Sequence, residues 1–169
     1  TGVSLTTSGS GTTYEIQITA ASTNGTIIPS INASGAADSA GNLNAASTGT
    51  DNTVTLDNTA PSVSSIVRAS SNTSNSGTVN FTVTFSENVS GVNTADFTLT
   101  TTGVSGTSVS SVNQVTASQY TVAVATGSNS GTIRLDLTDD DSIADSAGNK
   151  LGGTGAANGN YTSGEVYTI

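Results

Sequence analysis

Apolar and polar residues alternate along several short stretches of the chain. The clearest stretch is residues 79–85, whose alternate positions are all apolar: Val79, Phe81, Val83 and Phe85. A period of two is the pattern of a half-buried β-strand. Similar patterns predict strands at residues 63–69, around Phe97 and Leu99, more weakly around Val109 and Val112, and at residues 120–124, 133–137 and 166–169. Short strands at this density, without helical periodicity, predict an all-β chain with an immunoglobulin-like (Ig-like) antiparallel β-sandwich.

The chain also repeats itself. The loop Asp38-Ser39-Ala40-Gly41-Asn42 recurs as Asp145-Ser146-Ala147-Gly148-Asn149. Two further matches, at a spacing of 106 residues, join residues 14–18 to 120–124 and residues 24–27 to 130–133. Self-similarity at a fixed spacing indicates tandem modules.

The repeat divides the chain into one and a half modules. We predict that residues 57–169 form a complete Ig-like module and that residues 1–56 form the C-terminal half of another, strands D to G. In that half, Ile16, Ile18 and Ile27 have no predicted strands A to C to pack against.

Two explanations of the half module are open. The sequence is either a fragment cut from a longer periodic protein, or a neighbouring molecule donates the missing strands, as in strand-complemented filaments. The first is favoured, because the chain contains no spare A-to-C segment to donate. The chain begins without Met, and we expect a mature product or an excised piece.

Composition and charge exclude several classes of function. The chain of 169 residues has a net charge of −9, and its only strong cations are Arg68, Arg134 and Lys150. Binding of nucleic acid or of an anionic lipid surface requires a basic patch, so neither is expected. No apolar run reaches the ~18 residues of a membrane span, and membrane insertion is not expected.

The chain contains neither Cys nor His. A disulfide framework, a zinc site of the usual composition and a Cys-His nucleophile pair are therefore excluded, and the commonest general base is missing. A glycosidase would need two acids facing each other across a cleft, whereas the acids here cluster in turns. We expect that the protein is not an enzyme.

Three stretches carry a family resemblance: Thr59-Ala60-Pro61, residues 83–89 (VTFSENV) and residues 144–149 (ADSAGN). Together they resemble the bacterial Ig-like repeats of very large cell-surface adhesins and S-layer-type proteins. In that family the modules are strung head to tail, often with calcium at their junctions. The resemblance implies a secreted module at the surface of a bacterial or archaeal cell. Its function would be that of a spacer in an adhesin or filament, with neighbouring modules as partners.

Residues 139–149 (DDDSIADSAGN) crowd carboxylates into one loop. In Ig order, the start of strand A, the B-to-C turn and the F-to-G connection lie at one end of the sandwich. Calcium takes 6 to 8 oxygen ligands, which carboxylates, amides and carbonyls supply. We predict a calcium site from these residues: Asp57, Asn58, Glu87, Asn88, Asp139, Asp140, Asp141, Asp145 and Asn149.

The alternative to a calcium site is an ordinary solvated acidic loop. The first copy has residues 32–35 (NASG) in place of the aspartate triplet, so a complete second site is not expected there.

A carbohydrate- or protein-binding module is the alternative function. Sugar recognition usually exposes aromatic platforms, and this chain has no Trp and three Phe that we predict in the core. Tyr161 and Tyr167 are the remaining candidates for a platform, and we expect each at a core or edge position. The spacer function is therefore favoured.

Overall fold

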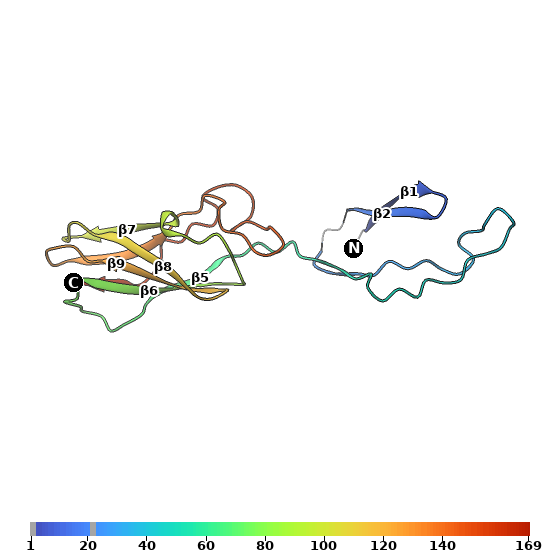
Figure 1. The fold of residues 1–169 in the computed structure, drawn as a ribbon. Coiled ribbons are helices and arrows are strands. Elements are labelled where there is room, and N and C mark those ends of the chain that lie inside the picture. The colour runs from blue at the N-terminus through green and yellow to red at the C-terminus, as the bar shows by residue number, and fades with distance from the viewer. Residues whose placement is uncertain (1–2, 21–22) are drawn as a thin grey trace. The chain divides into compact units, whose positions relative to one another are not determined.

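The computed structural model describes residues 3–20 and 23–169 (Figure 1). The regular elements of these residues are β-strands paired antiparallel, together with the short 3-10 helix η1 (Thr94–Asp96). The predicted all-β class is confirmed. No helix in the described part of the chain has the length and hydropathy of a membrane span. The chain divides into two compact units, Thr1–Thr59 and Ala60–Ile169.

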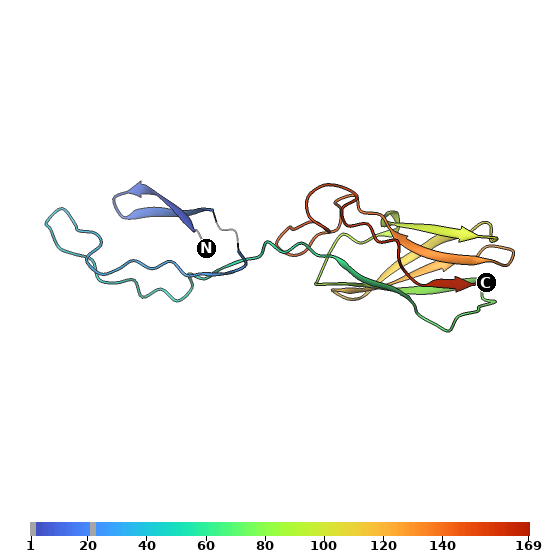
Figure 2. The ribbon, with the colours of Figure 1, turned by 180° about the vertical axis from the view of Figure 1, so that it is seen from behind.

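The second unit contains the strands that alternation predicted. They are β5 (Val63–Arg68), β6 (Thr78–Phe85), β7 (Phe97–Thr102), β8 (Ser108–Thr116), β9 (Gln119–Ala125), β10 (Thr132–Leu137) and β11 (Val166–Thr168). They form one sheet of order β5-β6-β9-β8 and a second of order β11-β10-β7. Figure 2 shows the two sheets from behind, with β11 in red at the end of the chain.

One hydrophobic core joins the two sheets of the second unit. Alternate positions of both sheets supply many of its fully buried side chains, among them Phe81, Val83, Val122 and Val124 from one sheet and Ile133, Leu135 and Tyr167 from the other. The rings of Phe81 and Tyr167 meet edge to face with centroids 5.1 Å apart. Two antiparallel sheets around a shared core are consistent with a β-sandwich. Tyr167, expected at a core or edge position, lies on the edge strand β11 with its side chain in the core.

An irregular pairing of strand β8 explains why the alternation of apolar residues around Val109 and Val112 is weak. Val109 pairs with Val124 and Val112 pairs with Val122, and the register shifts between Val109 and Ser111. Such a shift, of the kind a β-bulge produces, inserts an extra residue and breaks the period of two.

The first unit consists of two strand pairs. Strands β1 (Ser4–Ser10) and β2 (Thr13–Ala20) form one pair, and β3 (Gly25–Ile27) and β4 (Val54–Leu56) form the other. None of the apolar side chains described in this unit is fully buried. The side chain of Leu5 is 56% exposed and that of Ile16 is 42% exposed.

Candidate functional site

Six of the eight acidic residues of the second unit gather at one end, which we call the acidic end (residues 60–62, 86–96 and 138–160). Backbone hydrogen bonds hold its segments together. The amide of Ser86 donates to the carbonyl of Ser62 (2.8 Å), and the amide of Gly152 donates to the carbonyl of Pro61 (2.8 Å). The start of β5, the β6-to-β7 loop and the β10-to-β11 connection therefore meet, as the sequence predicted for this unit.

Glu87 and Asp145 are brought close together at the acidic end. Each offers a carboxylate oxygen, and these two oxygens lie within 4.8 Å of each other. Their neighbours Ser90 and Ala144 form an antiparallel bridge, with amide-to-carbonyl distances of 2.8 and 3.1 Å. The bridge fixes the two loops in register, so the two carboxylates share one site. Asn88 and Ser146 line a shallow hollow beside it.

Asp145 closes its own turn. Its Oδ1 accepts hydrogen bonds from the amides of Ala147 (2.8 Å) and Asn149 (2.9 Å), and its Oδ2 accepts one from Nδ2 of Asn149 (2.8 Å). Burial opposes ionisation of Asp145, but these hydrogen bonds outweigh it and lower the pKa of the carboxyl. A carboxylate has about four acceptor positions, so Oδ2 retains a lone pair for a further ligand.

The identical turn in the first unit has the same geometry. Oδ1 of Asp38 accepts from the amides of Ala40 and Asn42, both at 2.9 Å, and Nδ2 of Asn42 donates to Oδ2 at 2.9 Å. The side-chain hydrogen bond from Asn42 is the main reason that the pKa of Asp38 is lowered. The turn is thus a local structure that the five residues form by themselves in both units.

The aspartate triplet faces another loop. Oδ2 of Asp139, a buried side chain, accepts from the amide of Gly159 (3.1 Å), and Oδ2 of Asp141 accepts from the amide of Gly155 (3.0 Å). Oδ1 of Asp141 is buried and has no hydrogen-bond partner. Asp139 and Asp141 therefore anchor the glycine-rich segment 151–160.

Asp96 is a buried acid that the sequence interpretation missed. It is 1% exposed, and its carboxylate accepts from the amide of Asn93 (2.7 Å) and the hydroxyl of Ser142 (2.9 Å). Burial raises the pKa of Asp96, and the charges of Asp140 and Asp139 raise it further. The spacing of Asn93 and Asp96 is that of a capping box, which is the signal that could have identified it.

Asp140 contrasts with Asp96. Its side chain is exposed, and hydrogen bonds from Ser142 lower the pKa of its carboxyl. The acidic end thus holds one acid that burial drives towards the neutral form and others that local hydrogen bonds keep ionised.

The connector residues Asp57 and Asn58 belong to the first unit. Nδ2 of Asn24 donates to Oδ1 of Asp57 (3.1 Å), and the amide of Asn58 donates to Oδ1 of Asn24 (2.7 Å). Their predicted part in a calcium site stays a prediction. Of the other predicted residues, Glu87, Asn88, Asp145 and Asn149 lie in the two loops joined by the Ser90–Ala144 bridge, and Asp139 and Asp141 contact the glycine-rich segment.

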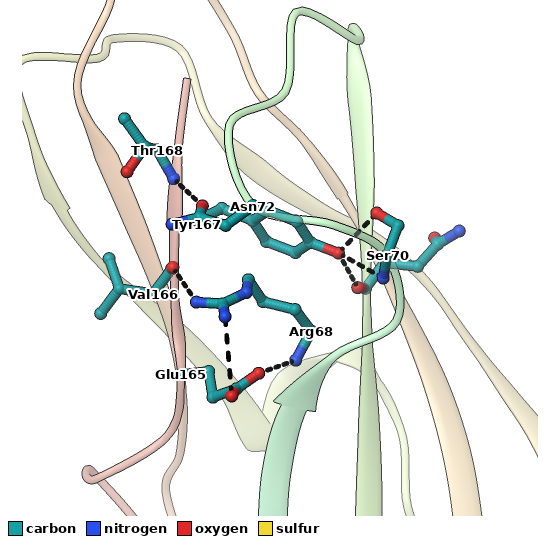
Figure 3. Close-up of polar contacts among 8 residues, drawn as sticks. Arg68, Ser70, Asn72, Glu165, Val166, Tyr167 and Thr168 are labelled. Carbon is teal, nitrogen blue, oxygen red and sulfur yellow. Dashed lines mark hydrogen bonds and ion pairs between the residues drawn. The ribbon is translucent and has the colours of Figure 1, made fainter.

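A second polar cluster joins the first and last strands of the second unit (Figure 3). The amide of Glu165 donates to the carbonyl of Ile66 (3.0 Å), and Oε2 of Glu165 accepts from the amide of Arg68 (2.8 Å). Nη1 of Arg68 donates to the carbonyl of Val166 (2.7 Å), and Nη2 of Arg68 lies 3.6 Å from Oε1 of Glu165. The guanidinium and the carboxylate thus hold both segments.

The contacts continue in the same direction along both segments. Oη of Tyr167 accepts from the amide of Ser70 (3.0 Å), and the amide of Thr168 donates to Oδ1 of Asn72 (2.8 Å). Residues 66–74 and 165–168 therefore run parallel, and we call this contact the parallel seam. Because β5 and β11 belong to different sheets, the seam ties one sheet to the other at their edge. The alternation of apolar residues in the sequence did not predict the parallel seam.

Comparison of the chain with protein-family models, with curated proteins and with solved structures found no significant match.

Proposed function

We propose that this protein is a non-catalytic Ig-like repeat that serves as a spacer in a cell-surface adhesin or filament. The observation that carries the proposal is the parallel seam between the first and last strands of the second unit. A spacer in a row of modules bears load between its two ends, and in this unit those ends lead into β5 and out of β11. When the two ends of the unit are pulled in opposite directions, the two parallel segments are sheared past each other. All the contacts of the seam then resist the force at the same time.

The strand order supports the Ig-like assignment. With β5 to β11 taken as strands A to G, the sheets have the orders A-B-E-D and G-F-C. These are the two sheets of a constant-type immunoglobulin sandwich. The Cys and Trp of antibody domains are absent from the chain, so the likeness is one of architecture.

Matching strand pairs support tandem modules. Ser10 pairs with Thr13 at the turn of β1 and β2, and Thr116 pairs with Gln119 at the turn of β8 and β9, at the spacing of 106 residues. Strands β3 and β4 pair as β10 and β11 do. These pairings support the proposed assignment of the first unit to strands D to G. The proposed partners are neighbouring modules, and the proposed location is the surface of a bacterial or archaeal cell.

Calcium is the proposed cofactor, with Glu87 and Asp145 as its first ligands. Their oxygens lie within 4.8 Å of each other, and Asn88 and Asn149 are in the same two loops. Asp57, in the connector, is the further carboxylate that the sequence predicts. The residues fit the ion, because Asp145 is kept ionised and retains an acceptor position. When bound, calcium would neutralise the like charges and tie the two loops together.

A thermal melt of the whole chain in calcium and in chelator tests this site. A ligand that binds only the folded state at 100 times its Kd stabilises it by about 2.7 kcal/mol, so we expect the melting temperature in calcium to rise by several degrees. Glu87→Gln should remove most of the rise, whereas Asp51→Asn, an exposed acid of the first unit, should leave it intact. Identical melts of the unmodified chain in calcium and in chelator would contradict the calcium site.

A further inference from the structure

The first unit has an unusual apolar surface. Val3, Leu5, Ile16, Ile18, Ile27 and Val54 line one hollow between its two strand pairs. Leu5, Ile16 and Val54 are exposed. Soluble domains rarely leave a contiguous apolar patch uncovered, and such a patch marks an interaction surface.

The second unit shows which strands adjoin the corresponding residues. At the spacing of 106 residues, Ile16 corresponds to Val122 and Ile18 to Val124, and both valines are fully buried. Val122 pairs with Phe81 of β6, and Val124 pairs with Val79 of β6. In the other sheet, Ile27 corresponds to Ile133, which pairs with Thr101 of β7 and is also buried. Strand β6 therefore lies beside Val122 and Val124 in one sheet, and β7 lies beside Ile133 in the other. Because the two sheets share one core, each of these strands also faces the buried residues of the opposite sheet.

The strand edges indicate the same missing elements. Strand β9 has two neighbours, β6 and β8, and β10 has two, β7 and β11. Among the described residues, β2 pairs with β1 alone and β3 with β4 alone. The open edges of β2 and β3 thus correspond to the edges that β6 and β7 occupy. An open edge beside an apolar face is a template for strand addition.

We propose that this face of the first unit binds a three-stranded segment with the pattern of β5, β6 and β7, joined in the same chain ahead of β1. The inference rests on the proposed tandem modules, and it names the occupant of the exposed face. In the second unit the corresponding segment, residues 60–102, comes ahead of β8 in the same way. The segment would cover the hollow with alternate apolar side chains and hydrogen-bond to β2 and β3.

A second copy of this chain does not suit the role of occupant. To donate residues 60–102, the second copy would have to withdraw Phe81 and Val83 from its own core, where both are fully buried. One apolar face would be covered while another was exposed, so the exchange gives no net burial. An additional segment covers the face without that loss.

The test extends the full chain at its N-terminus with a second copy of residues 57–106. Because Thr107 corresponds to Thr1 at the spacing of 106 residues, the added strands are placed in register with β1 and β2. Hydrogen exchange is measured in chelator for the amides of Ile16 and Ile18, with Val122 and Val124 as internal references. We expect exchange at the two isoleucines to slow by about 1,000-fold or more, towards the rates of the references.

A matched control carries Phe81→Asp and Val83→Asp in the added copy only. It should leave exchange at Ile16 and Ile18 fast, while the references stay slow because the original β6 is unchanged. Fast exchange at Ile16 and Ile18 in the unmodified extension would overturn the proposal. So would slow exchange in the unextended chain that depends on protein concentration, because it would identify a second copy as the occupant. A failed melting test in calcium would affect only the calcium site, since this exchange is measured without the ion.

Discussion

Tyr167 has two roles at once in the second unit. Its ring packs against Phe81 in the core, and its hydroxyl donates to the carbonyl of Asn80 (3.0 Å) while accepting from the amide of Ser70 (3.0 Å). A sugar-binding platform would require this ring at the surface, and it is fully buried. The residue therefore contributes to the sandwich core and to the parallel seam.

Replacing Tyr167 with Phe should lower the free energy of unfolding by about 1–3 kcal/mol, because the amide of Ser70 would lose its acceptor while the ring keeps its packing. Urea unfolding of the full chain measures the change. Tyr161→Phe is the matched control, since the Tyr161 hydroxyl makes no hydrogen bond among the described residues, and it should change stability by less than about 0.5 kcal/mol. Equal losses in the two variants would argue against the role given to this hydroxyl.

At the scale of elements, the strands of the second unit could be predicted because one face of each is buried. Strand β6 keeps strict alternation, as Phe81 and Val83 face the core while Thr82 and Thr84 are half-buried. Strand β8 gave a weak signal, because the shift of register after Val109 interrupts the period. Periodicity reports burial within one strand, so it locates strands better than it reports irregularities in their pairing.

The candidate site could be predicted only in part. The turn of Asp145 repeats that of Asp38 because its hydrogen bonds are local, so sequence identity was a sufficient signal. Oδ2 of Asp141 and Oδ2 of Asp139 accept from backbone amides 14 and 20 residues away, in a segment whose glycines carry no periodic pattern. The parallel seam joins residues about 97 apart through side chains and single backbone contacts, and no local rule predicts such pairs.

The seam leads to a prediction about force. Glu165→Ala removes the acceptor of the Arg68 amide, so the force needed to unfold the second unit by pulling at the chain ends should fall. The equilibrium stability should fall by only about 1 kcal/mol or less, since the ion pair is partly exposed. Single-molecule pulling and urea unfolding measure the two quantities. Gln114→Ala, on the edge strand β8, is the control. A Glu165 variant that unfolds at the same force as this control would contradict the proposed mechanical role of the seam.

At the scale of the whole molecule, the two units differ in how well they cover their apolar residues. The second has a continuous core from both sheets, whereas the first leaves Ile28 and Leu43 exposed. Regions with few buried contacts open at low free energy cost. The first unit should therefore be the less stable of the two in this chain.

Limited proteolysis checks that difference. Thermolysin, which cuts beside large apolar residues, should remove the first unit rapidly and leave a resistant fragment that begins near Ala60 and ends at Ile169, because cleavage follows the population of open forms. Mass spectrometry identifies the fragment. The variant Phe81→Ala tests whether resistance depends on the core of the second unit. That substitution should cost about 3–5 kcal/mol and make the resistant fragment susceptible as well. Simultaneous loss of both units from the unmodified chain would show that their stabilities do not differ as expected.

The turn that begins at Asp38 forms these hydrogen bonds in a unit whose described apolar side chains are not fully buried. Its counterpart at Asp145 lies within the long connection from β10 to β11. A turn that needs no distant contact can form early in folding, and it shortens the flexible length that must be ordered before β11 reaches β10. The turn would then help set how quickly the second unit pairs its last strand during folding.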